Sequence, residues 1–513
     1  MHSHVTIIGA GLAGLVASCY LRKCGFEVSV VEKNATPGGR ARQFSEKGFV
    51  FDMGPSWYWM PDVFESFFAD FGKKTSDYYK LVRLSPSYTV FFENEEWDIP
   101  SSMEELGRLF ETLETGSRER LQAYMHDAAA KYAVGMHRFA SKPALHLSEF
   151  MSGDILSLLH KLQPFRNMEQ HVNRYFSHPL IRKIMQFPVI FLGAMPHRIP
   201  AMYSLMNYAD TRLGTWYPLG GMHEIVKAVY KLAKALGVKF RFGADVAGID
   251  MEDKKARAVR FNNERLATDI VIGAGDYHGI ESLLPEDYRQ YDNRYWESRE
   301  MAPSCLLYFL GIDKRLPLQH HSLFFDTSFE GHGKALYQDP EWPKNPLFYV
   351  CAPSVTDPSV APEGCENLFV LIPVAAGLDG DTAAMRREYL DMVLKRLEER
   401  TKTDIKNHIV FQKDYAISDF QQDYHAFKGN AYGLANTLMQ TAFGKPRMHS
   451  RKVENLFFCG QLTVPGPGLP PAFLSGKMVA EQVLKYAQQK LDFSTHSTKE
   501  KHEYPFSVQP SEL

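Results

Sequence analysis

Apolar residues near the N-terminus form two short runs separated by a longer amphipathic stretch. Residues 5–9 and 27–32 have the length of strands and are rich in β-branched side chains, which is typical of strands buried in a parallel sheet. Residues 15–24, between them, have the length and spacing of a helix. The pattern therefore predicts a β-α-β unit at the start of the chain.

Helical and strand-like patterns alternate over longer segments further along. Helix-like spacing dominates residues 103–195, with breaks near 141–143 and 178–179. Strand-like runs gather between 281 and 447, which indicates a second, mixed sheet. Residues after 488 are polar and are expected to be disordered. The other predicted elements are helices at 61–71, 201–210, 220–236, 382–400 and 471–486, and strands at 238–242, 305–311, 347–351, 368–374 and 409–412.

A glycine-rich motif joins the first predicted strand to the first predicted helix. Gly9 permits a tight strand-to-helix turn, Gly11 lets backbone amides approach a pyrophosphate, and Gly14 lets the helix pack closely on the sheet. Glu32 ends the second strand, where its carboxylate can accept hydrogen bonds from a ribose. Strand, glycines, helix, strand and acid occur in the order that predicts a bound dinucleotide.

A second glycine turn indicates which dinucleotide is bound. Gly38, Gly39 and Arg40 begin six residues after Glu32, and an ordinary nicotinamide dehydrogenase does not need such a turn. A flavin dinucleotide reaches further, so a Gly-Gly-Arg turn can approach its phosphates while the guanidinium adds charge and donors. The predicted cofactor is FAD.

Composition narrows the class of partner. Of 513 residues, 58 are basic and 60 acidic, so the chain lacks the basic excess expected of a nucleic-acid-binding protein. Neither a secretory signal nor an apolar run long enough to span a bilayer is found, so a cytoplasmic protein with reduced thiols is expected. No metal site is predicted, since the six cysteines are scattered and His320 and His321, if both lie on a strand, point to opposite faces. Aromatic residues reach 13%, which leaves much flat apolar surface to bury.

Several blocks of sequence resemble a known family. Glu32 followed by Gly-Gly-Arg is similar to the FAD superfamily of amine oxidases, protoporphyrinogen oxidases and carotenoid desaturases. Within it, the chain resembles the bacterial-type phytoene desaturases from about residue 5 to 486. The blocks that carry this resemblance are FDMGPSWYWMP at 51–61, WYPLGGM at 216–222, and NLFFCGQLT at 455–463 continuing through PGPGLPP at 465–471.

The resemblance implies an α/β fold in which a Rossmann-like FAD-binding domain is interrupted by a helical, membrane-facing lobe and a mixed-sheet substrate domain. The expected boundaries are 1–75, 216–281 and 449–490 for the FAD-binding parts, 76–215 for the helical insert, 282–448 for the substrate domain, and 491–513 for a polar tail. Motifs and resemblance together assign the following residues to FAD: Gly9, Gly11, Gly14, Glu32, Lys33, Gly39, Arg40, Gly54, Val246, Gly460, Gln461, Gly468 and Leu469.

The implied reaction is desaturation of phytoene, a C40 hydrocarbon, toward lycopene. A hydride leaves one allylic carbon for flavin N5 and a proton leaves its neighbour. Asp52 and Glu169 are the candidate proton acceptors. Quinone or oxygen is expected to reoxidise the flavin, because no second complete dinucleotide motif is present, and the lipid substrate implies a peripheral membrane location. Aromatic side chains can line a slot for the hydrocarbon, and the candidates are Trp57, Tyr58, Trp59, Tyr203, Tyr208, Trp216 and Tyr217.

Rival interpretations stay open from sequence alone. Within the family, the substrate can be a later or modified carotenoid, and the reaction an oxidation or a cis-trans isomerisation. An amine oxidase is disfavoured, since Cys459 precedes Gly460 and that family's flavin-linking cysteine block is missing. A non-enzymatic prenyl-binding escort protein is disfavoured by the intact glycine motifs.

Overall fold

Three separate stretches of chain build one parallel sheet. The computed structural model describes residues 3–136, 163, 165–441 and 444–494. The sheet has the order β19-β13-β1-β2-β9, and every neighbouring pair in it is parallel. Its strands are β1 (His4–Ile8), β2 (Glu27–Val31), β9 (Lys239–Arg241), β13 (Ile270–Gly273) and β19 (Leu456–Phe458). The predicted β-α-β unit is confirmed, because α1 (Leu12–Lys23) connects β1 to β2.

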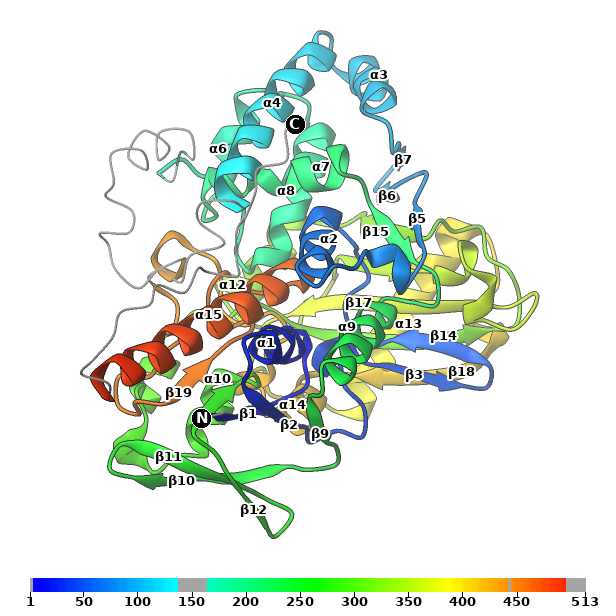
Figure 1. Ribbon diagram of the computed structural model, residues 1–513. Coiled ribbons are helices and arrows are strands. Elements are labelled where there is room, and N and C mark those ends of the chain that lie inside the picture. Colours follow the sequence, from blue (N-terminus) through cyan, green and yellow to red (C-terminus); the bar gives the residue numbers. More distant parts are fainter. Residues whose placement is uncertain (1–2, 137–162, 164, 442–443, 495–513) are drawn as a thin grey trace.

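Layers cover both faces of this sheet. On one face α1 lies between α9 (His223–Ala235) and α15 (Leu469–Ser494), as Figure 1 shows. On the other face a three-stranded antiparallel sheet packs its apolar side chains against Ile8 and Val31. Its strands, in order, are β10 (Val246–Glu252), β11 (Lys255–Phe261) and β12 (Glu264–Ala267). Strands buried on both faces need apolar residues at successive positions, which explains the continuous runs in the sequence. The predicted Rossmann-type α/β fold is confirmed.

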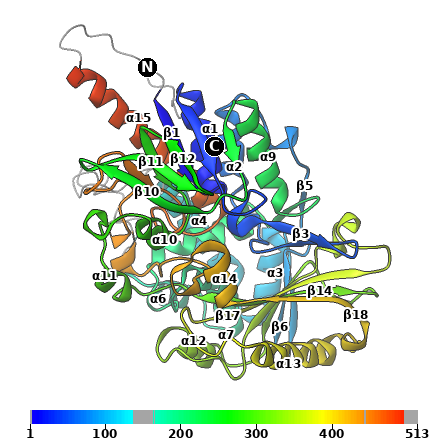
Figure 2. The same ribbon diagram turned by 90° about the horizontal axis from the view of Figure 1, so that it is seen from below.

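A seven-stranded mixed sheet forms the second lobe, in the order β18-β14-β17-β16-β15-β6-β7. Alternate side chains on its strands serve opposite faces. Leu306 and Tyr308 of β14 face α13 (Ala383–Thr401), which packs along the sheet in Figure 2, whereas Cys305 and Leu307 face the interior of the protein. The strands are β6 (Tyr88–Phe92), β7 (Glu96–Ile99), β14 (Ser304–Ile312), β15 (His321–Phe325), β16 (Phe348–Cys351), β17 (Glu366–Val374) and β18 (Ile409–Tyr415).

A helical insert stands above both sheets in Figure 1. Its helices are α3 (Met103–Leu113), α4 (Ser117–Val134), α6 (Met168–Asn173), α7 (Pro179–Gln186) and α8 (Leu205–Asn207). The single helix predicted at 201–210 is wrong in detail, because the chain passes from a 3-10 turn at Ala201–Ser204 through α8 into a π-helix at Tyr208–Arg212. The break near 178–179 is confirmed by the start of α7 at Pro179, and the break at 141–143 lies outside the described residues.

The boundaries of other predicted elements fall within a few residues of the observed ones. α2 (Pro61–Ala69) buries Phe64, Phe67 and Phe68 as its spacing predicts, and α9 ends before Gly237, whose φ of +87° only glycine adopts readily. α15 extends to Ser494, so the disorder predicted from residue 489 starts too early, and residues 495–513 lie outside the described chain. Among the described helices, none combines the length and apolarity needed to cross a membrane.

Candidate active site

One large cavity lies at the carboxyl edge of the parallel sheet. It has a volume of about 1220 Å³ and is lined by the residues that follow β1, β2, β13 and β19. Ligands of open α/β sheets bind at this edge. The volume exceeds the roughly 300–1,000 Å³ of most small-molecule pockets, so the cavity has room for a dinucleotide and part of a second ligand. It continues from the glycine motif to the interior face of the seven-stranded sheet.

The glycine motif needs glycine for two different reasons. A β-carbon on Gly14 would lie 2.3 Å from the backbone oxygen of Gly9 and 2.9 Å from the β-carbon of Ala274, so only glycine permits α1 to pack here. A β-carbon on Gly11 would have no protein atom within 4 Å, because that position faces the cavity. Gly11 is also the N-cap of α1, where free backbone amides attract a phosphate. The cradle therefore fits the pyrophosphate of a dinucleotide.

Glu32 is held rigidly at the end of β2. Its carboxylate accepts hydrogen bonds from the backbone N–H of Ala10 at 2.6 Å and from the backbone N–H and side-chain amide of Asn34, each at 2.9 Å. The residue is only 5% exposed and lines the cavity. Oε1 accepts both hydrogen bonds from Asn34, whereas Oε2 accepts only the one from Ala10 and keeps a lone pair for a ribose hydroxyl.

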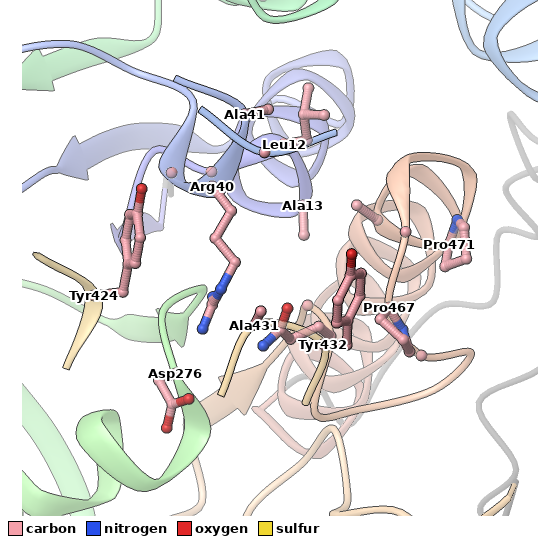
Figure 3. A pocket seen from close by; sticks show the side chains of 18 of the residues that line it. Leu12, Ala13, Arg40, Ala41, Asp276, Tyr424, Ala431, Tyr432, Pro467 and Pro471 are labelled. Carbon is pink, nitrogen blue, oxygen red and sulfur yellow. The ribbon is translucent and has the colours of Figure 1, made fainter. Parts of the chain in front are cut away.

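Arg40 also lines the cavity, and its side chain extends toward Asp276 (Figure 3). Its Nη2 donates to the backbone oxygen of Asn430 at 3.1 Å, and its guanidinium lies 5.1 Å from the ring centroid of Tyr424. Burial lowers the pKa of Arg40, and the carboxylate of Asp276 raises it again. Its Nε has no protein partner in the described part of the chain. A buried cation with a free donor fits an anionic ligand such as a phosphate.

The C-terminal loop closes the far end of the cofactor region. Gly460 follows β19, and the loop runs to Leu469, where the 26-residue helix α15 begins. The side-chain amides of Gln461 and Asn430 lie 2.7 Å apart, which ties this loop to the second lobe. The N-terminus of α15 carries partial positive charge and suits a reduced, negatively charged flavin.

Twelve of the thirteen residues assigned to FAD line this one cavity, although they come from positions 9 to 469. They are Gly9, Gly11, Glu32, Lys33, Gly39, Arg40, Gly54, Val246, Gly460, Gln461, Gly468 and Leu469. Gly14 lies beneath it, packed on the sheet. The residues present fit the cofactor that the sequence predicts.

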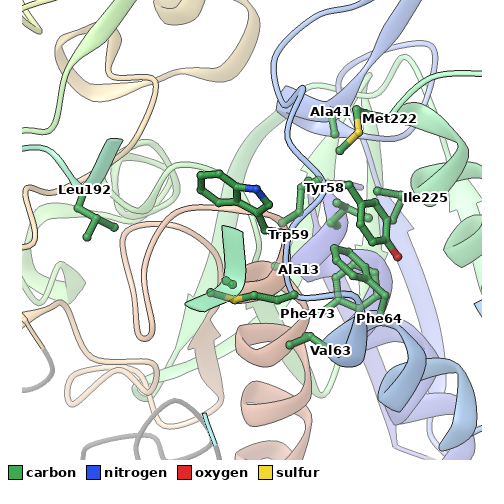
Figure 4. Packing of buried hydrophobic residues seen from close by; sticks show 14 of the residues in the cluster. Ala13, Ala41, Tyr58, Trp59, Val63, Phe64, Leu192, Met222, Ile225 and Phe473 are labelled. Atoms are coloured by element: carbon green, nitrogen blue, oxygen red, sulfur yellow. The ribbon is translucent and has the colours of Figure 1, made fainter. Parts of the chain in front are cut away.

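Only part of the expected aromatic wall lies at the cavity. Trp57, Trp59 and Tyr203 line it, and the indole rings of Trp57 and Trp59 lie 5.2 Å apart. Tyr58 points the opposite way, because side chains alternate along an extended segment. Its ring stacks on Phe64 at 4.4 Å, and Figure 4 shows it directed toward Phe64 and away from Trp59. Tyr58 is therefore a core residue.

Three other candidates also lie outside the cavity lining. Tyr208 lies on the π-helix with its ring 5.2 Å from Tyr132. The indole N–H of Trp216 donates to the backbone oxygen of Leu213 at 2.9 Å. Tyr217 is 1% exposed and lies behind the wall. These aromatics therefore do not form the cavity wall.

Neither proposed carboxylate base lies at the cavity. Asp52 accepts hydrogen bonds from the backbone N–H groups of Met222 at 2.6 Å and His223 at 3.1 Å, and thereby caps the start of α9. Burial raises the pKa of Asp52 to about 6, against the lowering effect of those two amides. Glu169 is exposed in the first turn of α6. The structure thus places both carboxylates away from the lining residues.

Sequence reasoning missed a buried amine beside the cavity. Lys445 is 4% exposed, and its Nζ has no hydrogen-bond partner in the described chain. A β-carbon on Gly466, which lines the cavity, would lie 3.5 Å from this Nζ and 3.4 Å from the side-chain oxygen of Asn436. Burial lowers the pKa of Lys445 to about 7. The signal that identifies Lys445 is the absence of a polar partner for its amine in the described chain, and this can be recognised only in the three-dimensional structure.

Other missed residues come from the second lobe. The cavity is closed on that side by Cys305, Leu307, Tyr349, Leu371 and Tyr432. Most of their strands were predicted, but the side of the sheet on which each side chain lies depends on the strand register, which the sequence alone does not give. Asp276 and Tyr424 were also missed, because only tertiary packing brings them next to Arg40.

Comparisons with known proteins agree with this geometry. Residues 12–484 match the family model described as flavin containing amine oxidoreductase. The chain is 40% identical over 486 residues to the carotenoid 3,4-desaturase of Haloarcula japonica, covering 94% of this chain and 98% of that one. It is 30% identical over 499 residues to a 4,4'-diapophytoene desaturase (4,4'-diaponeurosporene-forming) of Staphylococcus aureus, covering 94% and 99%. An oxidoreductase from Methanosarcina mazei shares the fold, with a TM-score of 0.61 at 18% identity over 93% of this chain and 100% of that one.

Proposed function

Because the chain belongs to the flavin-containing amine oxidoreductase family and, within it, to the carotenoid desaturases, we propose that it introduces a double bond at the 3,4 position of a carotenoid. It is an FAD-dependent oxidoreductase. The observation that supports the 3,4 position is its greater similarity to the Haloarcula japonica enzyme than to the Staphylococcus aureus one.

The cavity supports a hydrocarbon substrate. FAD, when bound, supplies a hydride acceptor. The chain itself has to hold a long apolar molecule and exclude water, and Trp57, Trp59 and Leu307 offer apolar surface for that purpose. Rigid aromatic side chains bury much area at low cost in side-chain entropy.

The proton that leaves the neighbouring carbon needs an acceptor. Lys445 fits this role better than Asp52 or Glu169, because its amine lies next to the cavity-lining residue Gly466 and has no other partner in the described chain. With its pKa lowered by burial to about 7, a large fraction of the amine is neutral at physiological pH and can take up a proton.

A second candidate is desaturation of phytoene toward lycopene. The sequence blocks around Trp57 and Gly460 resemble phytoene desaturases, and the Staphylococcus aureus relative supports an early desaturation step. In either case we propose that the substrate enters from a membrane surface and that quinone or oxygen reoxidises the flavin. Binding to substrate-loaded liposomes in a flotation assay would support the membrane proposal, and a wholly unbound protein would contradict it.

The discriminating experiment supplies each substrate separately. FAD-loaded protein is incubated with liposomes that contain either lycopene or phytoene. The carotenoids are then separated by chromatography, and their molecular masses are determined by mass spectrometry. We expect lycopene to lose two hydrogen atoms and phytoene to stay unchanged, with the protein lacking FAD as control. Conversion of phytoene alone supports the second candidate. Conversion of neither, by a protein with bound FAD and added quinone, contradicts both.

A further inference from the structure

A cluster of two imidazoles and a thiol lies behind the aromatic wall, outside the cavity lining. The ligand atoms of His320, His321 and Cys351 all lie within 4.8 Å of one another, and all three residues are buried. The sequence-based expectation of opposite faces required both histidines to lie on a strand, and this condition is not met, because β15 begins only at His321 and His320 lies in the preceding loop. Their ring centroids are 4.5 Å apart. Cys351 of β16 is the direct cross-strand partner of His321.

Each imidazole of this cluster has one unpaired ring nitrogen. The Nε2 atoms of His320 and His321 are buried and have no hydrogen-bond partner in the described residues. Leaving such atoms unpaired costs about 1–3 kcal/mol each. The Tyr349 hydroxyl donates to Ser56 at 2.9 Å, so at 2.6 Å from His321 its oxygen accepts from the Nδ1–H. That tautomer leaves Nε2 with a free lone pair.

His320 has the equivalent support on its other nitrogen. Its Nδ1 lies 2.8 Å from the hydroxyl of Thr356. An imidazole whose Nδ1 is hydrogen-bonded to a neighbour and whose Nε2 is free is the usual arrangement of a metal-binding histidine. Burial lowers the pKa of both imidazoles, His320 to about 3, which keeps them neutral and able to bind a cation.

The surroundings carry negative charge that suits a cation. Asp357 is 3% exposed and acts electrostatically on His320, while Asp52 acts in the same way on Cys351. In the described chain neither carboxylate forms a salt bridge. Burial raises the pKa of the Cys351 thiol to about 12, so the thiol stays protonated unless a metal replaces its proton.

We propose that His320 Nε2, His321 Nε2 and Cys351 Sγ bind one Zn²⁺ ion. Two imidazoles and one thiolate are ligands that zinc prefers, and a water molecule can fill the fourth tetrahedral position. Binding replaces the thiol proton with the metal and releases that proton to solvent. The ion ties β15 to β16 and fixes His321, whose ring stacks on the cavity-lining indole of Trp57 at 4.0 Å with an interplanar angle of 15°. The site thus supports one wall of the substrate region.

The test measures metal directly and does not depend on any carotenoid reaction. Full-length protein with bound FAD is stripped with a chelator, reloaded with zinc sulfate and desalted, and its zinc content is determined by mass spectrometry. We expect about one zinc per chain. X-ray absorption at the zinc edge is expected to show one sulfur at about 2.3 Å and two imidazole nitrogens at about 2.0–2.1 Å.

A matched pair of variants identifies the sulfur. Cys351→Ser is expected to weaken zinc binding at least tenfold and to remove the sulfur signal. Cys305→Ser, at a buried thiol on β14 of the same sheet, is expected to change neither. Flavin content and circular dichroism report whether each variant folds. If Cys351→Ser does not fold, the X-ray absorption spectrum of the zinc-loaded wild-type protein still decides whether sulfur binds the metal. The proposal is overturned if the reloaded protein retains no stoichiometric zinc, or if the bound zinc shows no sulfur neighbour.

Discussion

Two alanine substitutions in the glycine motif should have opposite consequences. Gly14→Ala places a β-carbon 2.3 Å from the backbone oxygen of Gly9, and a backbone atom cannot yield as a flexible side chain does. Overpacking of this kind costs about 1–3 kcal/mol, and the closeness of the contact points to the upper end, about 3 kcal/mol. Because the clash is within the protein, the loss of stability should be present with or without cofactor.

Gly11→Ala should leave the protein without cofactor almost unaffected. Its β-carbon meets no protein atom within 4 Å, and the φ of −68° and ψ of 168° at Gly11 suit alanine. The remaining cost at the N-cap is below about 1 kcal/mol. The new methyl group instead occupies space that a pyrophosphate needs, so FAD affinity should fall at least tenfold, which corresponds to about 1.4 kcal/mol.

Denaturant unfolding of both proteins without cofactor measures the first effect, and titration with FAD followed by flavin fluorescence measures the second. Wild-type protein carried through the same removal of cofactor is the control. The reasoning is refuted if both variants lose the same stability without FAD, or if Gly11→Ala binds FAD as tightly as the wild type does.

Three further substitutions test the wall and the proton acceptor. Trp57→Ala should raise KM for the carotenoid about tenfold or more, because burial of a large apolar side chain contributes roughly 1.5–3 kcal/mol. Tyr58→Phe should leave KM unchanged and cost only about 1 kcal/mol of stability, because it loses the hydrogen bond to Tyr79. Equal KM changes for the two variants in steady-state assays would contradict this. Lys445 has a folded pKa of about 7 against 10.5 unfolded, so the unfolded state binds more protons in that range and stability without FAD should rise with pH between the two values, by at most about 1.4 kcal/mol per pH unit. Lys445→Met should abolish that rise and lower kcat without changing flavin content, and an unchanged kcat would exclude the amine as proton acceptor.

The dinucleotide end could be predicted from sequence because its information is local. Gly9, Gly11 and Gly14 lie within six consecutive residues, and each glycine has a steric reason that follows from a strand turning into a helix. Arg40 could be added because it follows directly on the same unit. Periodicity placed β2 to within one residue and α1 to within three, since α1 begins at Leu12 and not at the predicted residue 15.

The substrate end could not be predicted in the same way, because it depends on the direction of each side chain. Trp57, Tyr58 and Trp59 are equivalent in sequence, yet the middle one faces the core, since the extended segment alternates and Tyr58 forms a bridge with Trp216. The direction of the His320 side chain could not be foreseen, because it depends on whether β15 includes His320 or begins at His321. Lys445 could not be found at all, because an amine without a partner looks like any other lysine until its surroundings are known.

The polarity of the cavity assigns each ligand to its own end. At one end, the carboxyl edge of the parallel sheet, Glu32 and Lys33 line the cavity just after β2 and Asp276 lines it just after β13. Toward the seven-stranded sheet it is lined by the indole of Trp57, which stacks on His321 of β15. A hydrocarbon gains nothing at the first end, where it would leave these polar groups desolvated and unpaired. A dinucleotide cannot reverse, because its phosphates would lose their donors at Arg40 and the helix N-termini and enter apolar surroundings, at a cost of several kcal/mol. We therefore expect one continuous cavity to bind the two ligands in a single order, with the reacting ends of both meeting between the parallel sheet and the seven-stranded sheet.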